Sequence, residues 1–175
     1  MGHHGEPRRG VGRACPGGCD IDSFALLVER HQRWVLNLAY QLVGSADEAE
    51  DVAQDVFVVA YQKLGQLRRR ANFRAWLRKI TVHQALRRRR KLSRTGPLEV
   101  EVSDENARAG NQTAVAVHEV LHSMPDHLAA VLILRELHSL SYQEIAEALD
   151  TPVGTVRSRL HAARECFRRL WEAER

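Results

Sequence analysis

The chain has 175 residues and a formal net charge of +4, from 26 basic and 22 acidic side chains. With 44% hydrophobic and 6% aromatic residues, it can bury a core in one or two small domains. No run of about 18 apolar residues occurs and residues 1–20 lack the apolar stretch of a secretory signal, so we expect a cytoplasmic protein without membrane insertion.

The N-terminal part of the chain predicts a disordered extension followed by helices. Residues 1–20 are rich in Gly, Pro and Arg, which is typical of disorder. From Phe24 onward, apolar residues recur with the i, i+3, i+4, i+7 spacing of an amphipathic helix, which Gly44 ends. Ser45 and Glu48 then have the Ser-x-x-Glu spacing of a capping box, which predicts the start of a second helix.

A third helix is expected after a break at residues 65–72, with its apolar side chains inside and its arginines outside. Residues 68–94 contain twelve basic side chains and no acidic one. A stretch of one charge sign is costly unless a polyanion meets it, which favours nucleic acid over a membrane surface or an acidic protein. The three helices predict one helical domain over residues 21–94.

A linker and a second helical domain follow. Residues 95–112 are acidic, contain Gly, Pro, Asn and Ser and have no apolar periodicity, so they predict a flexible linker. Helical patterns resume near Thr113 and continue to the end, giving a second domain over residues 113–175. Because no strand pattern occurs, we expect an all-α fold: a three-helix-type bundle and a domain with a helix-turn-helix, joined by the linker.

Residues 142–161 have the spacing of a helix-turn-helix. A capping box at Ser141 and Glu144 opens the first helix, and Asp150 occupies the turn, where Gly is usual. Asp tolerates the left-handed backbone conformation, so we expect the turn to form. A recognition helix lies in the major groove, where Arg pairs with guanine. The side chains expected on its outer face include Thr155, Arg157, Ser158, His161 and Arg164.

The order of these segments resembles the ECF (extracytoplasmic-function) group of bacterial sigma factors. DEAEDVAQDVFVVAYQKL at 47–64 is similar to region 2.2 of that family, and NFRAWLRKITVHQALRRRRK at 72–91 to regions 2.3 and 2.4. SYQEIAEALDTPVGTVRSRL at 141–160 is similar to region 4.2. ECF members keep domains 2 and 4, which would be residues 21–94 and 113–175 here.

The resemblance implies roles for individual residues of the first domain. Asp47, Asp51, Gln54 and Asp55 would contact the clamp helices of the RNA polymerase beta-prime subunit. The −10 element of the promoter would be read by Leu67, Arg68, Arg69, Arg70, Asn72, His83, Arg87 and Arg88. The DNA backbone would be held by Arg74, Arg89, Arg90 and Lys91. The family commonly has Asn at the position of His83, so the −10 preference is not carried over.

In the second domain, the resemblance places Thr155, Arg157, Ser158, His161 and Arg164 at the −35 element. The implied function is a sigma factor that directs core RNA polymerase to promoters and promotes DNA melting. The implied partners are core polymerase (beta-prime clamp helices and beta flap), promoter DNA and an anti-sigma factor. The linker, eighteen residues long, spans at most ~60 Å, on the order of 17 base pairs, so one chain can hold two separated promoter boxes.

Two other classes of function are the alternatives to a sigma factor. A free-standing helix-turn-helix regulator would bind duplex DNA without polymerase, commonly through a dimer helix, for which the sequence has no extra heptad seam. A nucleic-acid enzyme would need a constellation of carboxylates or of His and Cys in a cleft, whereas the acidic residues fall on one helix face and in the linker. We therefore expect no enzyme and no cofactor.

The three cysteines predict no disulfide framework and no metal site. Cys15 and Cys19 lie in the N-terminal extension with a spacing that matches no standard zinc pattern, and their redox or metal role is left open. Cys166, beside Phe167 on the last helix, is expected to be a small buried hydrophobe.

Overall fold

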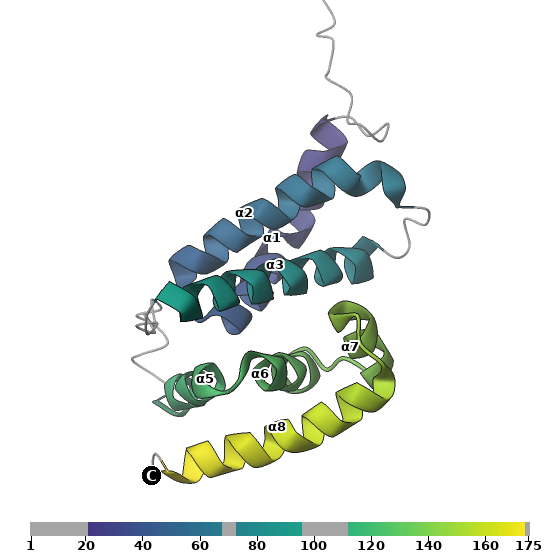
Figure 1. The fold of residues 1–175 in the computed structure, drawn as a ribbon. Helices are drawn as coiled ribbons and strands as arrows, with labels where there is room; N and C mark the ends of the chain where they lie inside the picture. Colours follow the sequence, from purple (N-terminus) through teal and green to yellow (C-terminus); the bar gives the residue numbers. More distant parts are fainter. Residues whose placement is uncertain (1–20, 68–72, 96–111, 174–175) are drawn as a thin grey trace, which may run out of the picture.

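The computed structural model describes residues 21–67, 73–95 and 112–173 (Figure 1). These residues form seven α-helices with two short helical turns of other types, and no strand occurs among them. The all-α prediction is therefore confirmed for this part of the chain. The extension at 1–20 and nearly all of the linker at 95–112 lie outside the described residues.

The first three helices form what we call the N-terminal bundle. It consists of α1 (Ile21–Val43), α2 (Ala46–Lys63), a single 3-10 turn at Leu64–Gln66 and α3 (Phe73–Thr95). Each of the three α-helices packs against the other two, as Figure 1 shows in purple and blue-green. Their apolar stripes meet in a core that includes Val35, Leu38, Leu42, Val52, Val56, Leu77 and Val82.

The turn between α1 and α2 has the predicted glycine stop and half of the predicted capping box. Gly44 has φ +88 and donates its N–H to the carbonyl of Tyr40 at 2.8 Å, which ends α1 in a left-handed conformation that favours glycine. The Ser45 hydroxyl accepts a hydrogen bond from the Glu48 N–H at 3.5 Å. The Glu48 carboxylate bonds to Arg88 of α3. At this end only the Ser45 half of the predicted capping box is found.

The remaining helices form the C-terminal bundle. It consists of α5 (Gln112–Ser123), α6 (Asp126–Leu132), a π-helical turn (Ile133–Leu137), α7 (Tyr142–Leu149) and α8 (Val153–Ala173). The long helix α8, yellow in Figure 1, runs beneath α5, α6 and α7 and packs against all three. Buried residues of this bundle include Val120, Ile133, Leu134, Ile145, Val156, Leu160 and Ala163. Cys166 is also buried, as predicted.

The two bundles pack directly against each other. Helix α3 lies against α7 and also contacts α6 (Figure 1). Buried residues of both bundles belong to one continuous apolar cluster. Rings meet across the boundary as well, since Tyr40 of α1 stacks on His118 of α5 with centroids 4.9 Å apart. The sequence predicted two domains joined by a linker, and the packing between them was not foreseen.

Candidate nucleic-acid interface

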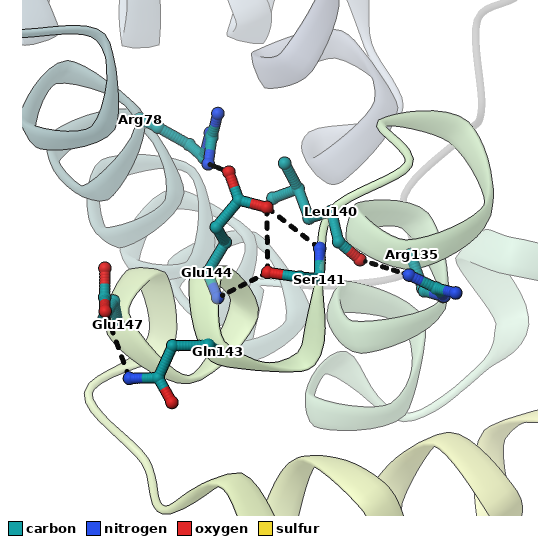
Figure 2. Close-up of polar contacts among 7 residues, drawn as sticks. All are labelled: Arg78, Arg135, Leu140, Ser141, Gln143, Glu144 and Glu147. Carbon is teal, nitrogen blue, oxygen red and sulfur yellow. Dashed lines mark hydrogen bonds and ion pairs between the residues drawn. The ribbon is translucent and has the colours of Figure 1, made fainter.

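The helix-turn-helix is built by local interactions that the sequence already indicates. The Ser141 hydroxyl accepts from the Glu144 N–H (3.2 Å), while Glu144 Oε2 accepts from the Ser141 N–H (2.9 Å), so the predicted capping box is confirmed (Figure 2). Hydrogen bonds from the Ser141 N–H, the Ser141 hydroxyl and Arg78 lower the pKa of Glu144. This cap fixes the start of α7.

The turn between α7 and α8 takes the conformation expected of its aspartate. Asp150 has φ 49 and ψ 49, in the left-handed region, and its N–H bonds back to the carbonyl of Ala146. The Thr151 N–H reaches the same carbonyl at 3.0 Å. Ile145 and Ala146 of α7 are buried, as is Val156 of α8. The buried contact and the turn together set the angle at which α8 leaves α7.

The outer face of α8 carries the residues predicted to read the −35 element. Arg157, Ser158 and His161 are exposed, and Thr155 is half-buried. The Ser158 hydroxyl donates to the carbonyl of Thr155 at 3.0 Å, within the helix. Arg164 is exposed but pairs with Glu136 at 2.9 Å, and this hydrogen bond raises the pKa of the guanidinium. Arg157 and His161 therefore present side chains to solvent on one side of the helix.

The basic residues of α3 do not share one environment. Arg87, Arg90 and Lys91 are exposed, and with Arg88 and Asp55 they line a groove between α3 and α2. Arg74, predicted to touch the DNA backbone, is exposed at the start of α3, with its guanidinium 5.4 Å from the centre of the Trp34 ring. The exposed cations give α3 an outer positive face that a polyanion can reach.

Arg88, predicted to read the −10 element, forms ion pairs with α2, the helix predicted to bind polymerase. Its guanidinium bonds to the Glu48 carboxylate and lies 3.1 Å from Asp51 Oδ2. The hydrogen bond with Glu48 is the main cause of the raised pKa of Arg88. Asp51 was predicted to contact polymerase and Arg88 to read the −10 element. In the structure these two side chains form an ion pair with each other. Asp47, Gln54 and Asp55 are exposed on α2.

Two further residues predicted to read the −10 element, Leu67 and His83, differ in their contacts. Leu67 follows the 3-10 turn, donates its N–H to the carbonyl of Leu64 at 3.1 Å and packs against the core. His83 is exposed on α3, and its Nε2 lies 3.3 Å from Asp150 Oδ2 in the helix-turn-helix turn. The remaining −10 candidates, Arg68, Arg69, Arg70 and Asn72, lie outside the described residues.

Arg89 departs from the expectation that the arginines of α3 point outward. Its side chain is 5% exposed, and its Nε lies 2.7 Å from Asp126 Oδ1. Its guanidinium also donates to the carbonyls of Leu42 (3.3 Å), His122 (3.3 Å) and Met124 (2.9 Å). Burial lowers the pKa of Arg89, against the opposing effect of Asp126. In this arrangement Arg89 is not accessible to DNA.

Sequence reasoning also missed the histidines beside Arg89. His118 and His122 lie one turn apart on α5 with ring centroids 4.4 Å apart, and both nitrogens of His118 and Nε2 of His122 are buried without a hydrogen-bond partner in the described structure. Their i, i+4 spacing among the apolar residues of α5 was the available signal. Over the described ranges, no group of three or more His, Cys, Asp or Glu side chains is placed to hold a metal ion. Cys15 and Cys19 lie outside those ranges.

Comparison with known proteins identifies the family. The chain matches the models of sigma-70 region 2 over residues 27–95 and of sigma-70 region 4 over residues 114–167. It is 35% identical to the RNA polymerase sigma-H factor of Pseudomonas aeruginosa, across 85% of this chain and 86% of that protein. Identity to the ECF RNA polymerase sigma-E factor of Escherichia coli K12 is 36%, across 85% of this chain and 86% of that protein.

Two solved structures have a similar fold. The sigma factor RpoE of Bartonella quintana, in complex with the anti-sigma factor NepR, is similar with a TM-score of 0.72 at 23% identity, covering 89% of this chain and 100% of that one. CnrH, in complex with the cytosolic domain of CnrY, has a TM-score of 0.66 at 26% identity, covering 88% of this chain and 90% of that one. Both likenesses extend over the two bundles.

The fold and its two matched regions thus define a helical transcription initiation factor that binds DNA. The chain belongs to the ECF group of the sigma-70 family of RNA polymerase sigma factors. A free-standing helix-turn-helix regulator is not favoured, because the region 2 match covers residues 27–95, which include most of the N-terminal bundle. Sigma factors are generally non-catalytic. Within the described part of the chain, none of the helices has the length and apolar character needed to cross a membrane.

Proposed function

We propose that the two bundles of this sigma factor divide promoter recognition between them, with α3 reading and melting the −10 element and α8 reading the −35 element. The N-terminal domain would span residues 21–94 and the C-terminal domain 113–175, with the linker at 95–112 between them. The observation that carries this proposal is the pairing of two exposed basic helix faces, on α3 and α8, within the regions matched to sigma-70 regions 2 and 4.

On α8, Arg157 is the main candidate for base readout. It is exposed, and its planar guanidinium can donate two hydrogen bonds to O6 and N7 of one guanine. Ser158 and His161 flank it on the outer face, with Thr155 and Arg164 at the margins. Arg164 would have to leave Glu136 to reach DNA.

On α3, Arg87, Arg90 and Lys91 supply exposed positive charge for the −10 region, and His83 and Arg88 join them once their carboxylate partners are exchanged for DNA. The loop at 68–72 would hold the displaced strand with Arg68, Arg69 and Arg70. Melting then needs no catalytic group, because binding of the unpaired strand shifts the equilibrium between closed and open DNA.

The exposed carboxylates of α2 are the proposed docking site for polymerase. Asp47 and Asp55 lie on α2 with Gln54, and an acidic face of this kind suits the positively charged surface of a larger partner. The C-terminal bundle would dock on the beta flap. An anti-sigma factor is a further proposed partner, since the two solved relatives were determined with NepR and with CnrY. The cytoplasm, where polymerase acts, is the proposed location.

The test adds core RNA polymerase to the purified chain on a library of promoter fragments and maps the transcription start sites. We expect starts that depend on the added chain and share two sequence boxes at a fixed spacing. Arg157→Ala should relax the sequence preference of the upstream box alone. The absence of any chain-dependent start, together with tight duplex binding in the absence of polymerase, would favour a free-standing regulator.

A further inference from the structure

Trp34 of α1 and Arg74 of α3 form a cation–π contact on the surface of the N-terminal bundle. The guanidinium of Arg74 lies over the Trp34 ring, 5.4 Å from the centre of the ring. Trp34 is half-buried and packs against the apolar core, whereas Arg74 is exposed. Arg74 makes no ion pair with a carboxylate in the described part of the chain, so it can leave the ring without breaking a salt bridge.

The packing of the first turn of α3 brings Arg74 to this place. Phe73, the first residue of α3, is buried, and its ring tilts against His31 of α1 with centroids 5.2 Å apart. Phe73 also contacts Trp76, with centroids 5.7 Å apart. These rings fix the start of α3 on α1, and the next residue, Arg74, thereby reaches the ring of Trp34.

The surface around Trp34 is positively charged. Arg30 and Arg33 of α1 are exposed within one turn of Trp34. Burial is the main cause that lowers the pKa of His31, and the charges of Arg74 and Arg30 lower it further, so both guanidinium groups lie near this imidazole. Proteins bind single-stranded nucleic acid with this combination of groups, because cations follow the phosphates while an aromatic ring stacks on a base.

The place of Arg74 along the chain also points to unpaired DNA. Arg74 follows the loop at 68–72 by two residues, and the proposed function gives that loop to the displaced strand. The sequence also predicts that Arg74 holds the DNA backbone. A strand that is held by the loop would therefore meet Arg74 and the Trp34 ring next.

We propose that the face of Trp34 covered by Arg74 is a stacking site for one base of the displaced strand, and that Arg74 moves to a neighbouring phosphate when the base binds. The inference rests on the proposed function of the N-terminal bundle and adds to it a contact on α1, outside both the loop and α3. The exchange is favourable because a base stacks on an aromatic ring more strongly than an exposed guanidinium does. A phosphate also offers Arg74 a bidentate partner.

The experiment uses the chain assembled with core RNA polymerase. The probe is a fluorescein-labelled single strand of about 20 nucleotides, with the non-template sequence of the melted region of a promoter found by the start-site mapping. Trp34→Leu keeps an apolar side chain for the core and removes the aromatic face, whereas Trp34→Phe keeps both. The matched control is Trp171→Leu, the same substitution at a half-buried tryptophan of α8.

We expect Trp34→Leu to bind the probe at least about fivefold more weakly than the parent chain, and Trp34→Phe and the control to stay within about twofold of it. Circular dichroism shows whether each variant keeps its helices, and Trp34→Met replaces Trp34→Leu if the latter loses them. Affinity for core polymerase is measured separately. Equal probe binding by Trp34→Leu and Trp34→Phe, or a loss that reflects only weaker binding to polymerase, would overturn the proposal.

A second readout removes the bases instead of the tryptophan. An abasic nucleotide is placed at each position of the probe in turn. Stacking predicts one position at which loss of the base weakens binding by the parent chain at least about fivefold but leaves binding by Trp34→Leu nearly unchanged, since the ring is already gone. If every base that matters to the parent chain matters equally to Trp34→Leu, the stacking site does not exist.

The start-site mapping separates this inference from the function on which it rests. Without any chain-dependent start, the sigma function fails and the stacking site fails with it. Chain-dependent starts combined with equal probe binding by Trp34→Leu and Trp34→Phe overturn the stacking site alone.

Discussion

The packing of the two bundles should weaken in mild acid, because it buries neutral histidines. His122 of α5 lies so close to Gly44 of α1 that a Cβ added to the glycine would come within 2.8 Å of the imidazole. Burial is the main cause that lowers the pKa of His122 to about 3, with smaller effects of the same sign from His118 and Arg89, and a hydrogen bond with the backbone of Gln41 opposes them.

The sign and size of the effect follow from this pKa. The ordinary value is 6.5. We call the form with the two bundles packed together closed and the form with the bundles apart open. Opening exposes the side of His122 that faces α1 and α3, so the open form binds a proton more readily. The stabilisation of the closed form is therefore fully present above pH 6.5 and is lost progressively as the pH falls toward 3. At about pH 5.5, His122 accounts for a loss of ~1.4 kcal/mol, or about tenfold in the closed-to-open ratio. Burial also lowers the pKa of His118, which adds to the loss.

The assay records energy transfer between fluorescent dyes attached at Glu50→Cys on α2 and Glu172→Cys on α8, both exposed positions, at three pH values between about 7.5 and 5.5. The closed fraction should fall with acidification in the parent chain. His122→Leu removes one of the two titrating histidines and should make the pH dependence clearly shallower, while His127→Gln, at an exposed position of α6, should leave it unchanged. A closed fraction that rises in acid, or an equal pH dependence in the parent and in His122→Leu, would refute the reasoning.

Four further outcomes test the site and the fold. Arg157→Ala should lose discrimination at the upstream box by about 1–3 kcal/mol in binding assays on matched and mismatched promoters, and an equal loss on both would contradict base readout. Arg90→Ala should weaken binding about evenly across sequences and reduce the salt slope by about one, measured by titration at several salt concentrations. Gly44→Ala should destabilise the chain by roughly 1–3 kcal/mol in denaturant unfolding, since φ +88 disfavours Ala and the Cβ meets His122. Ser141→Ala should cost about 0.5–2 kcal/mol by loss of the cap, and no change in the unfolding midpoint would contradict its role.

The helices, and those of their ends that a glycine or a capping box marks, could be predicted from the sequence because their causes are local. Periodic apolar residues, Gly44 and the Ser141 cap act within one or two turns of chain, and the structure has the corresponding helices. The left-handed turn at Asp150 likewise follows from the conformational preference of one residue. The Ser45 box was half wrong because the partner of Glu48, Arg88, lies forty residues away in the sequence.

The candidate site could be predicted only as a set of residue types. The sequence indicated which helix faces are basic, and Arg157 and His161 of α8 are exposed as expected. It gave no means of telling Arg89 from its neighbours Arg88 and Arg90, since all belong to one run of arginines. Which of them is buried depends on how α3 is rotated against α1 and on what packs over it, and both are tertiary properties.

The sequence by itself determined the all-α class, the two helical regions, the helix-turn-helix and the separation of acidic from basic surface. These follow from periodicity, capping and charge, which act over a few residues. Only the tertiary structure decided that the two bundles share one apolar cluster, that Arg89 is buried and that the Nε2 atom of His122 is buried. The reason is that the contacts of Arg89 join helix ends far apart along the chain, and no local pattern records which carbonyls a guanidinium will meet after folding.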